Sequence, residues 1–171
     1  MRKQIFAGLG INSLIMNTID IEQRAAKAKE LFLSGYNCCQ SVVLAFEDIT
    51  ALEPTLAATI SAPFGGGMGR LREVCGAVSG MTMLAGFISP CPTNSDAVAK
   101  KENYALVQLF ADKFRMENGD IVCRRLLGLE PIAERNETPM PSERTAEYYR
   151  KRPCSEYVGC AARIVAEYLA K

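Results

Sequence analysis

The sequence predicts an all-α fold, a compact bundle of six to eight helices without a sheet, and three observations lead to it. Apolar residues recur with the helical period through most of the chain, and no run alternates with the period of two that marks a strand. The 171 residues are 49% hydrophobic and 23% charged, as in an ordinary globular domain. A chain of this length can bury a core without disulfide bonds. We therefore expect one helical domain over residues 20–171, after a poorly ordered lead-in at residues 1–19.

Three helices are predicted in the first third of the chain, because each has a residue that favours a helix start. Asp20 and Asn37 are good N-caps, and Pro54 suits the first turn of a helix. The predicted helices cover about residues 20–34, 38–49 and 54–62. The segment FGGGMGR at residues 64–70 follows and predicts a glycine-rich turn.

Four further helices are predicted in the rest of the chain. Asn94 or Ser95 caps the long one, Asp120 caps a short one, and Pro153 opens the last. The predicted ranges are about 72–88, 95–116, 120–127 and 153–170. Between the last two, residues 129–152 are polar and rich in proline, so we expect a long loop with one helical turn near residues 144–149.

Composition excludes several classes of function. The chain has no histidine, which rules out Ser–His and Cys–His dyads, imidazole metal ligands and a histidine-ligated haem. A formal net charge of +1 and the absence of tryptophan do not suggest nucleic-acid binding. The mildly apolar residues 5–16 are too short to span a bilayer and no cleavage site follows them. We expect a cytoplasmic protein that does not span a membrane.

The chain has seven cysteines although it has no histidine, and three of these cysteines fall in the first turn of a predicted helix. These are Cys38, Cys123 and Cys154. The partial positive charge and free N–H groups of a helix N-terminus stabilise a thiolate, which is both a nucleophile and a metal ligand. The alternative for each is that cysteine packs as a small apolar residue. The odd count and the lack of a secretion signal favour a reducing compartment.

Cys75 differs, because we expect it one turn inside the helix predicted at residues 72–88. Gly76 and Gly80 lie beside it and each costs about 1 kcal/mol of helix stability relative to alanine. Such residues allow a close approach, either by another backbone or by a bound group. Cys39 adjoins Cys38, and sequence spacing alone does not decide which of the two belongs to the site.

Cys91 and Cys160 are the least promising of the remaining thiols. Cys91 lies between two prolines in a loop, and Cys160 lies on the apolar face of the last helix, where we expect it to pack in the core. No CxxC pair occurs, so zinc ribbons and thioredoxin-type motifs are not supported. Any cysteine site has to be assembled from separate helices.

The glycine-rich turn is the second candidate feature. It does not follow a strand as GxGxxG does and it lacks the GK[ST] of a P-loop, so it does not favour nucleotide binding. Gly66 and Gly67 would instead let backbone pass close to helix ends and donate N–H bonds to sulfur. Arg70 and Arg72 would add positive charge beside Cys75, although both also suit a solvated helix start.

The chain resembles a known family at these residues. The segments GYNCC at 35–39, FGGGMGRLREVCGAVSG at 64–80, CRRLLG at 123–128 and PCSEYVG at 153–159 are similar to the C_GCAxxG_C_C family of redox-active proteins. The likeness extends over about residues 20–170. It implies an α-helical fold and four characteristic cysteines, which by position are Cys38, Cys75, Cys123 and Cys154. Related domains occur in split-Soret-type cytochromes, where such a fold carries an iron–sulfur site, but this chain has no haem attachment motif.

Three hypotheses for function follow from the residues and the resemblance. The first is a redox protein whose four cysteines ligate a metal centre, with a [2Fe–2S] cluster favoured by the resemblance, zinc as an alternative, and Gly66, Gly67, Arg70 and Gly76 around it. The second is a metal-free thiol–disulfide redox protein. The third is a non-catalytic helical binding module with packing cysteines. We expect an unidentified redox protein as partner, and a homodimer is compatible with the sequence.

Overall fold

The computed structural model describes residues 19–129 and 138–171, and in these ranges it contains nine α-helices and no strand. Their bounds are α3 Ile21–Leu33, α4 Cys38–Leu44, α5 Glu47–Thr50, α6 Pro54–Ser61, α7 Gly76–Ile88, α8 Ala97–Asn118, α9 Cys123–Leu126, α10 Ala146–Lys151 and α11 Cys154–Leu169, with a 3₁₀ turn, η2, at Ala62–Phe64. Six of the nine have seven or more residues. The all-α prediction is confirmed. The predicted lead-in lies, apart from Ile19, outside the described residues.

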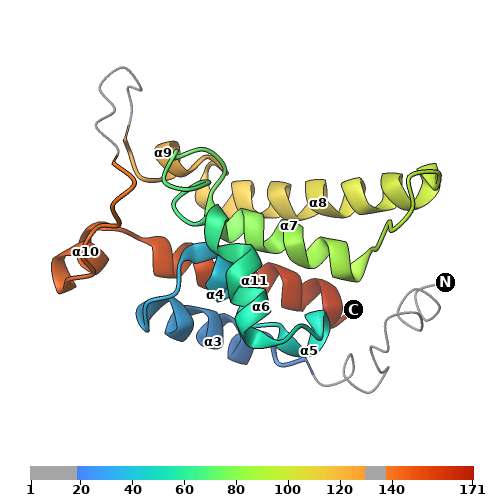
Figure 1. Cartoon of the computed structure of the whole chain (residues 1–171), viewed down its shortest axis with the longest axis horizontal. Helices are drawn as coiled ribbons and strands as arrows, with labels where there is room; N and C mark the ends of the chain where they lie inside the picture. Colours follow the sequence, from blue (N-terminus) through green and yellow to red (C-terminus); the bar gives the residue numbers. More distant parts are fainter. Residues whose placement is uncertain (1–18, 130–137) are drawn as a thin grey trace.

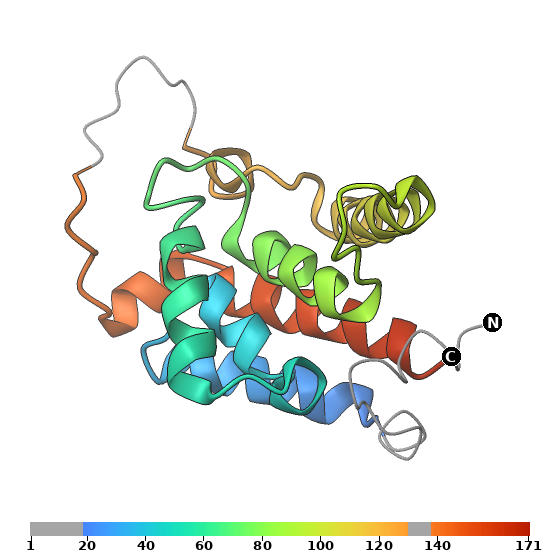
Figure 2. The same ribbon diagram turned by 45° about the vertical axis from the view of Figure 1, so that its right-hand side comes forward.

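Helix α11 is the centre of the bundle. It packs against α3, α4, α7 and α8, and α7 lies between α4 and α8 (Figures 1 and 2). The largest buried side chains come from α3, α7, α8, α11 and the turn after α4. Among them are Phe32, Phe46, Met81, Phe110 and Phe114. The apolar faces predicted from the helical period therefore meet in one core.

The direction of the helices determines where the cysteines gather. Helices α4, α7 and α11 all begin at the left-hand end of the molecule in Figure 1, and α3 and α8 run the opposite way. The short helix α9, the glycine-rich turn and α10 lie at the same end (Figure 1). The N-termini of three core helices therefore converge on one end of the bundle, and their partial positive charges add there.

Two predicted helices are shorter in the structure. The helix expected at residues 38–49 ends at Leu44, because Phe46 leaves the helical conformation (φ −126°, ψ 40°) as its ring enters the core. The helix expected from residue 72 begins at Gly76. Arg70 and Arg72 have left-handed backbone conformations (φ 71° and 62°), which continue the glycine-rich turn and exclude a helix there.

Two predicted caps also differ. The long helix α8 is capped by Asp96, whose carboxylate accepts from the Ala99 N–H at 2.8 Å, and neither Asn94 nor Ser95 has that role. Asp120 accepts instead from the N–H groups of the next two residues, and α9 begins only at Cys123. No helix in the described part of the chain has both the length and the apolar character that a membrane crossing requires.

Candidate functional site

Four cysteines lie at the starts of four helices at this end of the bundle. Cys38, Cys123 and Cys154 are the first residues of α4, α9 and α11, as predicted. Cys75 is the N-cap residue of α7, so the prediction that it lies inside a helix is wrong. Cys75, Cys123 and Cys154 are buried, and Cys38 is half-buried.

Cys38 is held by a capping box at the start of α4. The Asn37 side chain accepts from the N–H groups of Cys39 and Gln40, and the Gln40 side chain accepts from the Asn37 N–H. The Asn37 amide also donates to the Ala62 carbonyl at 2.9 Å. This cap ties the first turn of α4 to the chain that enters the glycine-rich turn.

Cys75 and Cys123 are brought together by a short backbone bridge. The Cys75 N–H donates to the Ile121 carbonyl at 2.8 Å, and the Cys123 N–H donates to the Glu73 carbonyl at 2.6 Å. Val74 and Val122 form an isolated antiparallel bridge between these bonds. Because this pairing uses the backbone before Cys75, α7 cannot begin earlier, and the two cysteines come to adjacent helix starts.

The glycine-rich turn packs directly against Cys123. From Gly66 to Arg70 five consecutive residues have positive φ, a conformation in which glycine is favoured. A Cβ at Gly67 would lie 2.8 Å from the Cys123 Cβ, so only glycine fits there. Arg70 points to the segment after the loop, where its Nε donates to the Thr138 carbonyl at 2.9 Å. Contacts of Gly66, Gly67 or Arg70 with a cofactor remain a prediction.

The two glycines after Cys75 allow α7 to approach α4. A Cβ at Gly76 would lie 2.9 Å from the Phe64 carbonyl oxygen and 3.1 Å from the Cys38 Cβ. A Cβ at Gly80 would lie 2.7 Å from the Val42 Cβ. Of the two explanations that the sequence left open, the structure therefore supports close approach by a neighbouring helix for both glycines, and that approach sets Cys38 beside the start of α7.

The four thiols interact with one another. Interaction with the Cys154 thiol, followed by burial, raises the pKa of Cys38 well above its ordinary value. The same interaction between the two thiols lowers the pKa of Cys154 despite its burial. Cys75 and Cys123 lie close enough to add repulsion between thiolates to the pKa of Cys38. Cys154 is thus the thiol most readily deprotonated within this group.

Burial dominates at the other two thiols. It raises the pKa of Cys75 to about 12, with repulsion from Cys123 as the next cause. The N–H groups of Ala77 and Val78 face the Cys75 sulfur and oppose that rise, although neither makes a side-chain capping bond of ordinary geometry. Burial also raises the pKa of Cys123, and Arg72 opposes it by charge and by a hydrogen bond.

Three arginines place positive charge around Cys154. Arg152, Arg72 and Arg144 each act to lower its pKa. Arg72 is only 5% exposed, so its charge acts within the protein. Sequence analysis anticipated positive charge from Arg72 beside Cys75, and in the structure Arg72 acts on the neighbouring thiols Cys123 and Cys154.

Arg144 and Arg152 were missed, because they lie in the polar stretch predicted as a loop. Both guanidinium groups contact the Tyr148 ring, at 5.8 Å and 5.1 Å from its centroid, and Arg144 also lies 4.7 Å from the Phe32 ring centroid. Arg144 donates to the Phe32 carbonyl at 2.8 Å. These contacts hold the segment with α10 against the core. The only local signal was the clustering of two tyrosines and four basic residues in residues 144–152.

Tyr157 is a further residue at the site that sequence analysis did not single out as functional. Its hydroxyl donates to the Leu126 carbonyl at 3.0 Å and so links α11 to α9. Burial raises its pKa, with further contributions from Cys154, Cys75 and Cys123. Tyr157 therefore lies beside three of the four thiols and holds the helix that carries Cys123.

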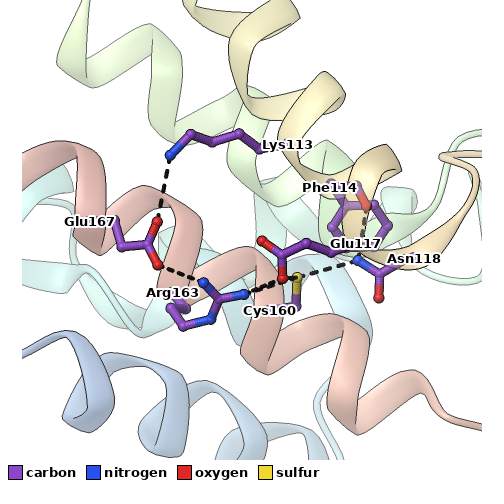
Figure 3. A network of polar contacts seen from close by, with 7 residues as sticks. All are labelled: Lys113, Phe114, Glu117, Asn118, Cys160, Arg163 and Glu167. Carbon is purple, nitrogen blue, oxygen red and sulfur yellow. Dashed lines mark hydrogen bonds and ion pairs between the residues drawn. The ribbon is translucent and has the colours of Figure 1, made fainter.

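The remaining cysteines lie elsewhere. Cys39 is fully buried beneath α7, with its sulfur 3.6 Å from the Met83 sulfur, and Cys91 lies half-buried in the loop before α8. Cys160 was predicted to pack in the core. It is half-buried at the core edge, and its thiol joins a polar network between α8 and α11, where it donates to Glu117 and accepts from Asn118 (Figure 3). The apolar period alone did not reveal that this helix face meets polar residues of α8.

All seven cysteines are free thiols. Within residues 19–129 and 138–171, no group of three or more Cys, Asp or Glu side chains is arranged to hold a metal ion. The chemistry around these thiols is nevertheless distinctive: the leading influences on their pKa values, besides burial, are the other thiols, backbone N–H groups and guanidinium groups.

Comparison with known proteins identifies the family. No curated protein and no solved structure matches the chain. The sequence pattern of one family matches residues 36–168, most of the chain, and this range contains all four of the cysteines at helix starts. The chain therefore belongs to the family described as "Putative redox-active protein (C_GCAxxG_C_C)".

Proposed function

We propose that Cys38, Cys75, Cys123 and Cys154 form one redox centre, and that the protein transfers electrons through an iron–sulfur cluster, with [2Fe–2S] favoured, held by these thiolates. One observation carries the proposal. Four thiols from four separate chain segments interact with one another at the convergent starts of their helices. Packing alone does not require thiols at four helix starts, whereas a thiolate-ligated group does need convergent sulfurs.

The surroundings of the thiols support the same chemistry. A cluster with four thiolate ligands is anionic, and Arg72, Arg144 and Arg152 supply compensating positive charge. Soft thiolates select iron–sulfur clusters, zinc or copper(I) over harder metals. Gly67 and Gly76 let backbone pass next to Cys123 and Cys38. The N–H groups of Ala77 and Val78 act on the Cys75 sulfur, and such groups tune the potential of a cluster.

A second candidate function rests on the interaction between the Cys38 and Cys154 thiols. In a metal-free protein these two thiols would form a disulfide, releasing two electrons and two protons to an oxidised partner. Cys154, with its lowered pKa, would be the attacking thiolate. This function uses two of the four cysteines and leaves Cys75 and Cys123 as buried neighbours.

Anaerobic purification with metal analysis tests both candidates. The cluster predicts visible absorption, and iron and acid-labile sulfide in equal amounts; zinc without colour would replace it by a structural or catalytic zinc site. Cys75→Ser should abolish or halve the metal content, whereas the matched variant Cys91→Ser should leave it unchanged. A metal-free wild type that gains a reversible disulfide between Cys38 and Cys154 would establish the second candidate. A metal-free protein without reversible disulfide chemistry would refute both and favour a binding module.

A further inference from the structure

Among the described residues, the end of the molecule that carries the cysteines has an excess of positive over negative side chains. Residues 64–75, 120–129 and 138–154 contain eight Lys and Arg side chains against four Asp and Glu, whereas the other described residues contain nine against twelve. The whole chain is almost neutral, with a formal net charge of +1. Within residues 19–129 and 138–171 the charges are therefore unevenly distributed: this end has four more cations than acids, and the remaining described residues have three more acids than cations.

Only part of this positive charge is needed to balance thiolates. Arg72 is buried and interacts with the sulfurs, whereas Arg125, Arg150 and Lys151 are exposed, on α9 and α10. Arg125 is paired with Asp120 and Lys151 with Glu147, so the net excess of cations at this end, not each exposed cation, determines its field. The N-termini of α4, α7 and α11 converge beneath the same surface and add their partial positive charges. The excess of positive charge at this end projects a field into solvent, where it attracts an approaching partner of opposite sign.

The same surface exposes apolar side chains. Met68, Leu71 and Val74 of the glycine-rich turn are 46%, 58% and 36% exposed, and they precede Cys75 in the chain. Met140, in the segment between α9 and α10, is 73% exposed. An apolar centre with charged residues around it is the usual composition of a transient protein interface, in which charge steers the encounter and apolar contact stabilises it.

We propose that this cationic end, formed by the glycine-rich turn, α9 and the segment with α10, is the docking surface for a redox protein that presents an acidic patch. The proposal rests on the proposed redox function for the identity of the partner as a redox protein. Docking there brings the partner to the end of the bundle where the four thiols lie, whereas the acidic remainder of the molecule repels a partner of the same sign. The surface thus selects the partner's orientation as well as its charge.

Binding of charged peptides to the full-length chain tests the surface without requiring a cluster. The probes are fluorescein-labelled peptides of twelve glutamates and of twelve lysines, followed by fluorescence anisotropy at about 0.1 M salt, where charges farther apart than about 10 Å are largely screened. We expect the glutamate peptide to bind and the lysine peptide not to bind near the cysteines. Amide NMR shifts on binding should map to residues 64–75, 120–129 and 138–154.

Charge-reversal variants locate the interaction. Arg150→Glu/Lys151→Glu should weaken binding of the glutamate peptide at least about tenfold, and Lys100→Glu/Lys101→Glu, at the start of α8 and the opposite end of the molecule, should weaken it less than about twofold. Both variants change the net charge by the same amount. Arg150→Gln/Lys151→Gln retains good helix formers and should give an intermediate loss, which guards against unfolding of the short helix α10.

Each result bears on the docking surface separately from the redox centre. Equal losses in the two charge-reversal variants, or NMR shifts centred on α8, would overturn the docking surface even if iron and sulfide are present. Loss confined to the Arg150/Lys151 variants supports it even if the centre proves to be a dithiol. If the redox experiments fail but peptide binding maps to the cationic end, the docking surface stands. Only the proposal that its partner is a redox protein is then refuted.

Discussion

The close approach of α7 to α4 makes a sharp prediction about two glycines in one helix. Gly80 and Gly86 both lie within α7, so replacing either by alanine should gain about 0.8–1 kcal/mol from helix propensity alone. Their surroundings differ. A Cβ at Gly80 would lie 2.7 Å from the Val42 Cβ and 3.2 Å from the Cys39 carbonyl oxygen, whereas a Cβ at Gly86 would meet nothing within 4 Å.

The contacts at Gly80 leave little room for relaxation. The Val42 Cβ is fixed to the backbone of α4, so relief requires the two helices to separate. Overpacking of this kind costs about 1–3 kcal/mol, which offsets or exceeds the propensity gain. Gly80→Ala should therefore have a free energy of unfolding about 0–2 kcal/mol below the wild type. Gly86→Ala should lie about 0.5–1 kcal/mol above it.

The comparison of the two variants isolates the helix contact, because the propensity term is shared. Urea unfolding followed by circular dichroism at 222 nm gives both free energies, and we expect a difference of about 1–3 kcal/mol between the variants. In thermal unfolding, 1 kcal/mol corresponds to about 2–4 °C for a chain of this size. Equal stabilisation by both substitutions would show that α7 does not pack closely on α4 at Gly80, and the position of Cys38 would then have to be reconsidered.

Three further predictions concern the thiols. Gly76→Ala, whose Cβ would meet the Phe64 carbonyl and the Cys38 Cβ, should lower metal content or Cys38–Cys154 disulfide formation more than it lowers stability, as measured by iron analysis and urea unfolding. Cys154, with its lowered pKa, should react with iodoacetamide at pH 7 faster than Cys160, whose pKa is raised by burial; mass spectrometry of peptides gives both rates, and a faster Cys160 would contradict the assignment. Burial raises the pKa of Cys39 from about 9 to about 12, so the stability that this thiol contributes is present below pH 9 and is lost as the pH rises toward 12. Cys39→Ala should make the alkaline decrease of unfolding free energy shallower by about 1.4 kcal/mol per pH unit, and an unchanged slope in reducing urea titrations would refute the burial of this thiol.

Local signals in the sequence were sufficient for most helix starts. Asp20 and Asn37 cap α3 and α4 as predicted, and Pro54 begins α6. These positions depend on contacts within a few residues, which a sequence displays directly. The predicted start of α7 was wrong, because that start does not depend on local contacts. Its position depends on backbone pairing of residues 72–75 with residues 121–124, and nothing in the local pattern around Cys75 reveals a partner so distant in the chain.

The surroundings of the thiols were harder to predict than the thiols themselves. Helix-start positions singled out Cys38, Cys123 and Cys154 because that signal is local. Arg144 and Arg152 reach Cys154 only because their segment folds back against Phe32 of α3, whose ring contacts Arg144 and Tyr149 from far away in the sequence. Cationic residues in a polar stretch are ordinarily solvated, so composition gave no reason to place them at the site.

Cys38 and Cys39 show how one residue of offset on a helix separates two kinds of chemistry. Both thiols belong to the first turn of α4 and share its capping box. Adjacent helical positions differ by about 100° in direction, so the two side chains face different neighbours. Cys38 faces the start of α11, where its interaction with Cys154 places it among ionisable thiols. Cys39 faces Met83 under α7, where burial alone sets its pKa at about 12. The sequence could not distinguish them, because the distinction is made by the helices that pack against α4 and not by α4 itself.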